Sequence, residues 1–448
     1  MESVRLRDAV IKGDWKTKLT ILISGFGNLT RRQFLKGLMF LAIQVFFWVF
    51  LFRFGIHYLK DITTLGTQTK AQVWDEVNQI YVYTTADNSL VILLYSIFTI
   101  AMAILATFFQ LVAVKSAYTA ELALKAGKRP GSFKQDLRDL FDKNMHTTML
   151  GLPSIGVIAF TVLPIIFMMC LAFTNFDRNH QPPGNLFTWV GLQNFADIFN
   201  GSAQKGYTFF RILGWTMVWA VCATFLNYIL GILVAMMINK KGIKLKSVWR
   251  TSLVIAIAVP GFVTLLFMRQ MLGDMGTVNT LLKSLHLIST PIHFLTDATT
   301  ARITVIVVNL WIGIPYTMLI TSGILMNIPA DLYEAARIDG AGVVRQFRSV
   351  TMPYILAVTT PYLITQFIGN INNFNAIYFL TGGTPLSTAY YQAGKTDLLV
   401  TWLYKLTVTY QDYNLASVIG IIAFAICGIM ALVTFNITAS AKREETFL

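Results

Sequence analysis

Eight long apolar runs constrain this chain more than any other feature of its sequence. A helix of ~20 apolar residues crosses the hydrocarbon core of a bilayer. Runs of about that length lie near 36–52, 90–113, 149–173, 212–237, 251–272, 303–323, 354–374 and 413–437. Because hydrocarbon offers no water to the backbone, each run must pair its own peptide groups, as a helix does. Only 13% of the 448 residues are charged, against about 25% in soluble domains. We therefore predict an all-α integral membrane protein with eight transmembrane helices.

The basic residues are distributed unevenly among the connecting segments. If the N-terminus is cytoplasmic, 25 of the 36 Lys and Arg residues fall on the inner side. Membrane proteins keep such an excess in their cytoplasmic loops. The distribution predicts that both termini are cytoplasmic, and it accounts for the net charge of +14 without a nucleic-acid partner.

The predicted spans divide the chain into five segments. Residues 114–148 are basic and amphipathic, which is typical of a helix lying along the inner membrane surface; a solvated linker is the alternative. The segments are a cytoplasmic basic N-terminal segment (1–35), a transmembrane hairpin (36–113), this cytoplasmic linker (114–148), a core of six spans (149–438) and a cytoplasmic tail (439–448).

A charged loop, residues 329–353, joins the sixth and seventh runs. Asp331 after Pro329 is a good N-cap, and Glu334 three residues later completes a capping-box pair. Gly340 is predicted to end this first short helix, since glycine tolerates the left-handed conformation of a helix end. A second helical piece over 343–350 is expected to end before Pro353. From these residues alone, an ordinary surface helix that turns the chain remains an alternative.

The sequence "EAARIDGAGVVRQFRSVTMP" in this loop resembles the EAA loop of ABC-importer permeases. The resemblance implies a type I (MetI-like) permease core of six helices, preceded here by the two-helix hairpin. It also implies that the loop docks into a separate ATPase subunit, which binds the ATP and Mg²⁺, so this chain is expected to hold no cofactor or metal. The matching positions, and therefore the implied coupling residues, are Glu334, Ala335, Ala336, Asp339, Gly340, Ala341, Phe347 and Pro353.

The segment "AYYQAGKT", residues 389–396, fits a permissive nucleotide-binding pattern. A phosphate-binding loop needs a glycine-rich turn between a strand and a helix, so that its backbone N–H groups surround the phosphate. This segment has Tyr-Tyr-Gln in the turn and lies in a predicted outer loop. We interpret it as a chance match, which leaves ATP hydrolysis to a partner.

Neutral polar residues recur inside two of the spans. In the seventh, Thr359, Tyr362, Gln366, Asn370 and Asn373 follow one another at intervals that place them on one helix face. In the sixth span, Asn309, Gly313 and Tyr316 share a face in the same way. A single residue of this kind is more often a hydrogen-bond partner for a neighbouring helix, but two aligned faces favour a substrate path.

The chemistry of these residues suits a neutral sugar. Side-chain amides offer a donor and an acceptor to adjacent hydroxyl groups, and aromatic rings stack on the apolar face of a pyranose. The span cores hold no Asp, Glu, Lys, Arg or His, whereas ion-coupled transporters usually need an intramembrane carboxylate or histidine.

Further stretches, including "VNLWIGIPYTMLI" and "FIGNINNFNAIYFLTGGTP", resemble the larger membrane subunit of maltose/maltodextrin importers over about residues 149–440. The resemblance implies that Asn309, Gly313, Tyr316, Asn370 and Asn373 line the sugar site. Ile257, Gly261 and Gly369 depart from the family pattern, which implies rearranged or fewer sugar contacts. The short outer loop 174–208 implies a Gram-positive source and a lipid-anchored binding protein.

These observations lead to one prediction of function. The chain is expected to be a non-enzymatic, multi-pass permease subunit in a bacterial cell membrane, importing maltodextrin, maltose or a related oligosaccharide. Its expected partners are a second homologous permease, two ATPase subunits, an extracellular sugar-binding lipoprotein and membrane lipid. The alternatives are a permease for another neutral solute, an ion-coupled secondary sugar transporter and a membrane scaffold without transport. The expected path residues are Asn309, Gly313, Tyr316, Tyr362, Gln366, Asn370 and Asn373.

Overall fold

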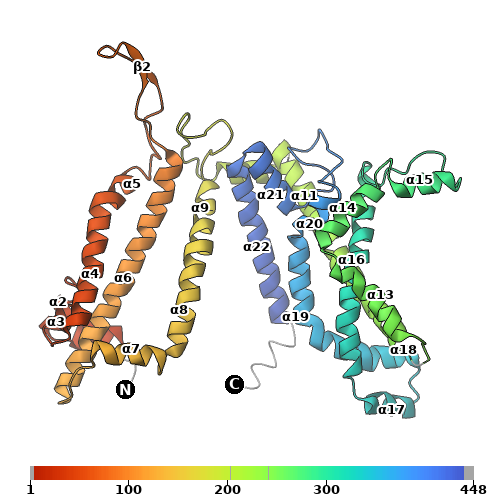
Figure 1. Ribbon diagram of the computed structural model, residues 1–448, viewed down its shortest axis with the longest axis horizontal. Coiled ribbons are helices and arrows are strands. Elements are labelled where there is room, and N and C mark those ends of the chain that lie inside the picture. The colour runs from red at the N-terminus through yellow and green to blue at the C-terminus, as the bar shows by residue number, and fades with distance from the viewer. Residues whose placement is uncertain (1–4, 202, 241, 438–448) are drawn as a thin grey trace. The chain divides into compact units, whose positions relative to one another are not determined.

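The computed structural model describes residues 5–201, 203–240 and 242–437, and nearly all of its regular structure is helical (Figure 1). The mostly helical prediction is therefore confirmed. The predicted tail, residues 439–448, lies outside the described residues. The chain forms two compact units, residues 1–191 and residues 192–448.

The first unit contains two long helical rods. The first runs without a break from Phe34 to Lys60, and the second is α6. The elements of this unit are α1 (Leu6–Lys12), α2 (Trp15–Leu19), α3 (Phe26–Leu29), α4 (Phe34–Phe50), the π-helical turn η1 (Leu51–Gly55), α5 (Ile56–Lys60), β1 (Gln72–Asp75), β2 (Ile80–Tyr83), α6 (Ser89–Lys125), α7 (Phe133–Phe141), α8 (Met145–Val157), the π-helical turn η2 (Ile158–Val162) and α9 (Leu163–Leu171).

Helix α6 is longer than the sequence pattern suggests. The Asn88 side chain caps its start by accepting hydrogen bonds from the N–H groups of Leu90 and Val91. Its 37 residues span about 55 Å at 1.5 Å per residue, well beyond a hydrocarbon core of about 30 Å. The first part of the linker 114–148 is thus a direct continuation of the second span, and α7, which Ser132 caps, follows it.

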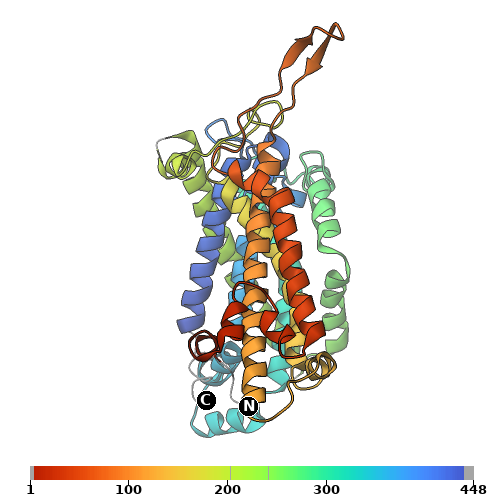
Figure 2. The ribbon, with the colours of Figure 1, turned by 90° about the vertical axis from the view of Figure 1, so that its left-hand side faces the viewer.

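An antiparallel hairpin, β1–β2, is the one sheet among the described residues, and the all-α prediction missed it. Its register pairs Gln72 with Tyr83 and Trp74 with Tyr81. Figures 1 and 2 both show the hairpin at one end of α4 and α6, and α1–α3 at the other end of the same helices. The two ends of this unit therefore carry different structures.

A buried ionic cluster attaches the N-terminal helices to α6. The Arg31 guanidinium pairs with Asp14 at 2.5 Å and with Glu121 at 3.5 Å, and it donates to the backbone oxygen of Ala117 at 3.1 Å. The side chains of Arg31 and Glu121 are each 3% exposed. Residues that the sequence indicated only as a basic segment therefore form a folded cap on α6.

The second unit is built from helices of very different lengths. Its elements are α10 (Gln193–Phe199), α11 (Gln204–Val221), the π-helical turn η3 (Cys222–Leu226), α12 (Asn227–Asn239), α13 (Lys246–Ala258), α14 (Gly261–Met271), α15 (Thr277–Ser284), α16 (Ala298–Met326), α17 (Ala330–Ile338), α18 (Val343–Gln346), the π-helical turn η4 (Phe347–Thr351), α19 (Met352–Ile371), α20 (Phe374–Leu380), α21 (Leu399–Tyr404), the π-helical turn η5 (Lys405–Tyr410) and α22 (Tyr413–Ile437). Within this unit, α15 and α17 lie at opposite ends (Figure 1).

Small residues allow the helices of the second unit to pack closely. Gly231 of α12 lies against α16, where a Cβ atom on it would come within 2.5 Å of the Thr317 Cβ atom. Large apolar side chains fill the remaining core, and Trp219 and Trp402 are fully buried. Close backbone approach at small residues is the usual basis of helix packing in membranes.

Six helical stretches in the described part of the chain are long and apolar enough to cross a membrane. They are Phe34–Lys60, Ser89–Lys125, Met145–Leu171, Gln204–Asn239, Ala298–Met326 and Tyr413–Thr434. The predicted run 251–272 is not one helix, because it breaks at Val259 and Pro260, where Val259 is extended; proline lacks the N–H group and disfavours helical geometry in the preceding residue. The run 354–374 corresponds to α19, whose Thr, Tyr, Gln and Asn side chains lower its apolar character.

Candidate functional site

A cavity of about 160 Å³ lies inside the second unit, between η3 with the start of α12, the middle of α16, and α19. All seven residues predicted to form a substrate path line it. The full lining is Ala223, Thr224, Asn227, Tyr228, Asn309, Ile312, Gly313, Tyr316, Thr317, Tyr362, Leu363, Gln366, Asn370 and Asn373. The described residues that line the cavity include no Asp, Glu, Lys, Arg or His, so the cavity suits a neutral ligand.

Gly313 brings α16 and the side chain of Asn227 together. A Cβ atom at position 313 would lie 2.5 to 2.7 Å from three atoms of the Asn227 amide group, closer than real Cβ contacts. Asn227 donates from Nδ2 to the backbone oxygen of Ala223 at 2.7 Å, which fixes the amide in this place. Glycine is therefore required at position 313 as long as Asn227 keeps this position.

Two polar atoms at the cavity are buried without a partner among the described residues: Asn227 Oδ1 and Asn309 Nδ2. Buried polar atoms almost always have a hydrogen-bond partner, and the exceptions need an explanation. One of these atoms is an acceptor and the other a donor. Hydroxyl groups can satisfy both kinds of atom, because a hydroxyl group is a donor and an acceptor.

Asn370 and Asn373 hold the end of α19 as well as lining the cavity. Asn370 Nδ2 donates to Thr224 Oγ1 at 2.9 Å, and the backbone oxygen of Asn370 accepts from Trp219 Nε1 at 3.0 Å. Asn373 Oδ1 accepts from the N–H of Ala376 at 3.2 Å and so caps α20. These two side chains are thus fixed by the corner between α19 and α20.

Aromatic side chains complete the lining from α16 and α19. The rings of Tyr316 and Tyr362 lie 6.0 Å apart between centroids, at an angle of 42°. Thr359, which shares the polar face of α19, does not line the cavity: it donates to the Ile355 backbone oxygen at 2.7 Å and bonds to Tyr228 Oη at 2.6 Å. That member of the polar face packs helices together.

The sequence reasoning missed Thr224, Asn227 and Tyr228, which form the third wall of the cavity. Their positions i, i+3 and i+4 lie on one helix face. This cluster of polar residues inside the apolar run 212–237 is the signal that could have identified them. Ile257, Gly261 and Gly369, the three departures from the family pattern, are not part of the lining.

In the charged loop 329–353, the first helix ends at the predicted residue but does not start at the predicted one. Pro329 occupies the N-cap position of α17, without a side-chain hydrogen bond, so the capping box of Asp331 and Glu334 was a wrong prediction. The helix begins at Ala330, two residues earlier than an Asp331 cap would allow, and this places Asp331 in its first turn, where a carboxylate interacts favourably with the positive end of the helix.

Gly340 ends α17 as predicted. Its φ is +74°, the left-handed region. The Ala341 N–H donates to the Ala336 backbone oxygen at 2.8 Å, and the Gly340 N–H donates to that of Arg337 at 3.0 Å. This pair of bonds is a Schellman ending, and it gives the Ala336–Ala341 part of the motif a structural reason.

The second piece does not stop before Pro353, contrary to the prediction. From Val343 the chain is helical through α18, the wide turn η4 and all of α19, with Pro353 in the first turn of α19. A π-helical turn leaves carbonyl groups without the usual i→i+4 donor, so the missing N–H of a proline one turn later is tolerated.

The loop presents an apolar face that its own unit leaves uncovered. None of the α17 residues is buried, and Glu334, Ala335 and Asp339 are exposed. Ile338 is 86% exposed and Val343 79%. Phe347 differs, because it packs in an apolar cluster whose buried members are Tyr228, Ile232, Ile324 and Ile355. A cluster that includes the cavity residue Tyr228 therefore connects this loop to the cavity.

The nucleotide-like segment 389–396 has no phosphate-binding geometry. The Gly394 N–H donates to the buried carboxylate of Asp397 at 2.7 Å, and the Lys395 ammonium group lies 3.8 Å from the ring centre of Tyr390. Neither group is directed toward an empty phosphate cradle. The interpretation of this segment as a chance match agrees with these contacts.

Comparison with known proteins identifies the family. Residues 227–443 match the family described as "Binding-protein-dependent transport system inner membrane component". The galactooligosaccharides transport system permease protein GanP of Bacillus subtilis is 36% identical over 431 residues, which are 95% of this chain and 98% of that protein. The maltodextrin transport system permease protein MalC of Streptococcus pneumoniae is 34% identical over 433 residues, 94% of this chain and 95% of that protein.

A solved structure has a similar fold. A chain from a bacterial ABC transporter that imports the acidic polysaccharide alginate superposes with a TM-score of 0.55 at 21% identity, covering 67% of this chain and 96% of its own. The matches to the permeases, which extend over nearly the whole chain, agree with this fold. The chain therefore belongs to the binding-protein-dependent inner-membrane components of ABC importers and is a MalF-like permease subunit.

Proposed function

We propose that this permease forms part of the translocation path for a neutral oligosaccharide, maltodextrin or a related glycan, in an ATP-driven importer. The observation that carries the proposal is the uncharged cavity with an unpartnered acceptor on Asn227 and an unpartnered donor on Asn309. Sugar hydroxyls satisfy both kinds of atom. The rings of Tyr316 and Tyr362 offer apolar faces for a pyranose.

The small volume of the cavity favours a transporter in which a second permease subunit completes the path. Ligand pockets usually measure about 300–1,000 Å³, whereas this one measures about 160 Å³. A path for an oligosaccharide would need further walls, and a homologous subunit related by a pseudo-twofold axis would supply them. We propose that this subunit, two ATPase subunits and an extracellular sugar-binding lipoprotein complete the transporter.

The coupling loop would transmit the movement of the ATPase to the spans. Of its motif residues, Glu334 and Ala335 are exposed on α17, Gly340 forms the turn that ends this helix, and Phe347 is anchored in the apolar cluster. Docking of the exposed apolar face on an ATPase would move the helical run from Val343 to Ile371 as one body. The Phe347 cluster with Tyr228 would carry that movement to the cavity.

We propose eight spans with both termini in the cytoplasm of a bacterial cell. Helices α13 and α14 would cross as one broken span and α19 as the seventh. Broken helices are tolerated at membrane depth where neighbouring helices or a cavity satisfy the backbone. The segment boundaries proposed from the sequence, 1–35, 36–113, 114–148, 149–438 and 439–448, follow from the same topology.

The test is uptake into vesicles that contain the reconstituted transporter, with ATP inside and the binding protein outside. Labelled maltodextrin should accumulate only with ATP. Asn309→Leu and Asn227→Leu should each lower uptake roughly tenfold, since a lost hydrogen bond to a buried group costs about 1–3 kcal/mol. Asn372→Leu is the matched control, because Asn372 is exposed and lies outside the lining. Uptake driven by a proton gradient without any ATPase would refute the proposal.

Galactooligosaccharides are a second candidate substrate. The relative named for them matches this chain over 98% of its own length at 36% identity. A competition panel with unlabelled maltodextrins, galactooligosaccharides and polyols in the same vesicles separates the candidates. The sugar that suppresses uptake at the lowest concentration is the substrate, and suppression by polyols alone would rule out both sugars.

A further inference from the structure

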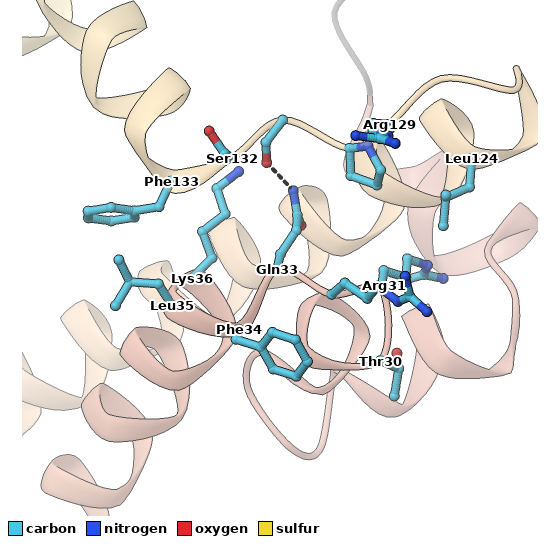
Figure 3. A pocket seen from close by; sticks show the side chains of 13 residues that line it. Thr30, Arg31, Gln33, Phe34, Leu35, Lys36, Leu124, Arg129, Ser132 and Phe133 are labelled. Atoms are coloured by element: carbon cyan, nitrogen blue, oxygen red, sulfur yellow. Dashed lines mark hydrogen bonds between the residues drawn. The ribbon is translucent and has the colours of Figure 1, made fainter.

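A basic pocket lies at one end of the first unit, formed by two adjoining hollows of about 830 and 870 Å³. Its walls are the start of α4, the last part of α6 and the segment 128–133 that leads into α7. The two hollows share Gln33, Lys36, Arg129, Gly131 and Phe133. The Gln33 side chain donates to the Gly131 backbone oxygen at 2.6 Å and so holds this segment beside α4 (Figure 3).

Cations outnumber anions around the basic pocket. The basic residues that line it are Arg31, Arg32, Lys36, Lys115, Lys128, Arg129 and Lys143, and the acidic ones are Asp136 and Asp139. Both acids are already paired, Asp136 with Lys36 and Asp139 with Lys143. Arg31 is held by the buried ionic cluster. Within the described residues Arg32, Lys115, Lys128 and Arg129 have no ion-pair partner. Arg32 and Arg129 line the first hollow, and Lys115, Lys128 and Arg129 line the second.

The backbone conformation places the consecutive residues Arg31 and Arg32 in different surroundings. Arg31 is buried, whereas the next residue, Arg32, is exposed. Arg32 has a φ of +62°, a conformation that is uncommon for a residue with a side chain. This turn between α3 and α4 sends the two consecutive guanidinium groups to different surroundings. Arg32 is free to bind an anion without loss of the contacts that hold the N-terminal helices.

The opposite side of the basic pocket is apolar. Phe34 is 66% exposed and Leu35 59%, and both stand at the first turn of the first membrane-crossing helix. Figure 3 shows Leu35 and Phe133 at the left of the view beside Lys36, Phe34 below the middle, and Arg31 and Arg129 at the right. The second hollow adds further apolar residues, namely Met39, Phe40, Val112, Leu137 and Leu140. A soluble anion would leave these apolar side chains uncovered, whereas the acyl chains of an amphiphile would cover them.

We propose that the basic pocket binds the headgroup of an anionic phospholipid, with Arg32 and Arg129 on the phosphate and the acyl chains along α4. Guanidinium groups bind phosphate oxygens in pairs, and basic pockets beside membrane helices recognise anionic headgroups. In the proposed topology the lipid belongs to the cytoplasmic leaflet. Lipid binding does not depend on sugar transport, so its test is independent of the test of the proposed function.

The experiment uses the whole transporter, purified in detergent, delipidated and examined by native mass spectrometry. Phosphatidylglycerol is titrated against phosphatidylcholine with the wild type, with Arg32→Gln/Arg129→Gln and with Lys134→Gln/Arg138→Gln. Lys134 and Arg138 are exposed residues of α7 that do not line the pocket, so the control loses the same charge nearby. A further arm adds millimolar inorganic phosphate to the wild type.

The wild type and the control pair should bind phosphatidylglycerol at least about tenfold more tightly than phosphatidylcholine. The Arg32/Arg129 pair should lose roughly 30-fold in affinity for phosphatidylglycerol, equivalent to about 1 kcal/mol per basic residue. An equal loss in the control pair would mean a diffuse surface charge and overturn the site. Displacement of the lipid by inorganic phosphate would assign the pocket to a soluble anion and overturn the lipid.

Discussion

At Gly313, the neighbouring Asn227 amide determines which residue the position can hold. A methyl group there would overlap that amide, since three of its atoms lie within 2.7 Å of the Cβ position. Asn227 and Gly313 belong to different helices, α12 and α16, so the constraint is tertiary. The glycine that the family resemblance placed in the path therefore has a physical role: it sets how deeply the Asn227 amide reaches into the cavity wall.

Gly313→Ala should lower sugar uptake at least tenfold, because overpacking of this kind costs about 1–3 kcal/mol and displaces Asn227. The measurement is ATP-driven uptake together with the melting temperature of the purified transporter. Gly323→Ala is the control on the same helix, since nothing lies within 4 Å of its added Cβ atom. The double change Asn227→Ala/Gly313→Ala should regain the melting temperature; failure to regain it would show that the overlap is not the cause.

Asp14 connects the folding of the first unit to acid pH. Burial raises the pKa of its carboxyl group, but hydrogen bonds from Thr17 and Arg31 outweigh this and lower the pKa to about 2, below the ordinary 3.8. A lowered pKa means stabilisation that is fully present above pH 3.8 and is lost as the pH falls toward 2. We expect the melting temperature of the wild type to fall across this window more steeply than that of Asp14→Asn. Parallel curves would contradict the role of Asp14.

Helix α17 has a well-defined C-terminal end, but the rest of its unit does not cover its apolar face. The Schellman bonds from Gly340 and Ala341 stop it, and the hydrogen bond between Tyr333 Oη and Thr351 Oγ1, 2.9 Å long, ties it to η4. Its exposed apolar residue Ile338 has no packing role in its own unit. An element that is so well fixed and yet so poorly covered is suited to bind a partner.

Ile338→Asp should weaken the association of the ATPase with the permease at least tenfold, since burial of such a side chain contributes about 1.5–3 kcal/mol. Co-purification of the subunits and ATPase activity stimulated by binding protein provide the measurement. Leu287→Asp is the matched control, because Leu287 is 67% exposed and follows α15, at the other end of the unit. Undiminished co-purification of the Ile338 variant would argue against docking at α17.

At the scale of the whole molecule, the distribution of charge and the position of the elements both bear on sidedness. The hairpin β1–β2 and the helices α1–α3 lie at opposite ends of the first unit (Figure 2). In the second unit, α17 lies at the end opposite α15 (Figure 1). In the proposed topology, which rests on the Lys and Arg counts, the ends with α1–α3 and α17 face the cytoplasm.

Cysteine labelling tests this topology. Val77, 90% exposed at the hairpin turn, and Ile338, 86% exposed on α17, are each replaced by Cys after Cys170, Cys222 and Cys427 are changed to Ala. A membrane-impermeant thiol reagent should label Val77→Cys in intact cells and Ile338→Cys only in inverted vesicles. Labelling of both positions from the same side would refute the proposed orientation.

Much of the fold could be predicted because apolar runs and glycines act locally. A run of about 20 apolar residues in a membrane satisfies its backbone as a helix, although the run 251–272 is divided into α13 and α14 at Pro260. Gly340 ended α17 as expected, since its left-handed conformation is a property of that residue. The misses occurred at the ends of helices: Pro329 took the N-cap position instead of Asp331, η4 continued the helix through Pro353, and α6 extended to Lys125.

The sequence by itself determined the membrane class, the neutral polar faces of two helices and the motif of the charged loop 329–353, because helical periodicity and composition can be read from a single chain. Only the tertiary structure decided that those two faces meet a third one, with Thr224, Asn227 and Tyr228, around one cavity. It also decided that Thr359 bonds to Tyr228 of a neighbouring helix instead of lining the cavity. In the same way, it decided that the N-terminal segment folds against α6 around Arg31. Such outcomes depend on pairs of residues far apart in the chain, and periodicity within one helix carries no information about its neighbours.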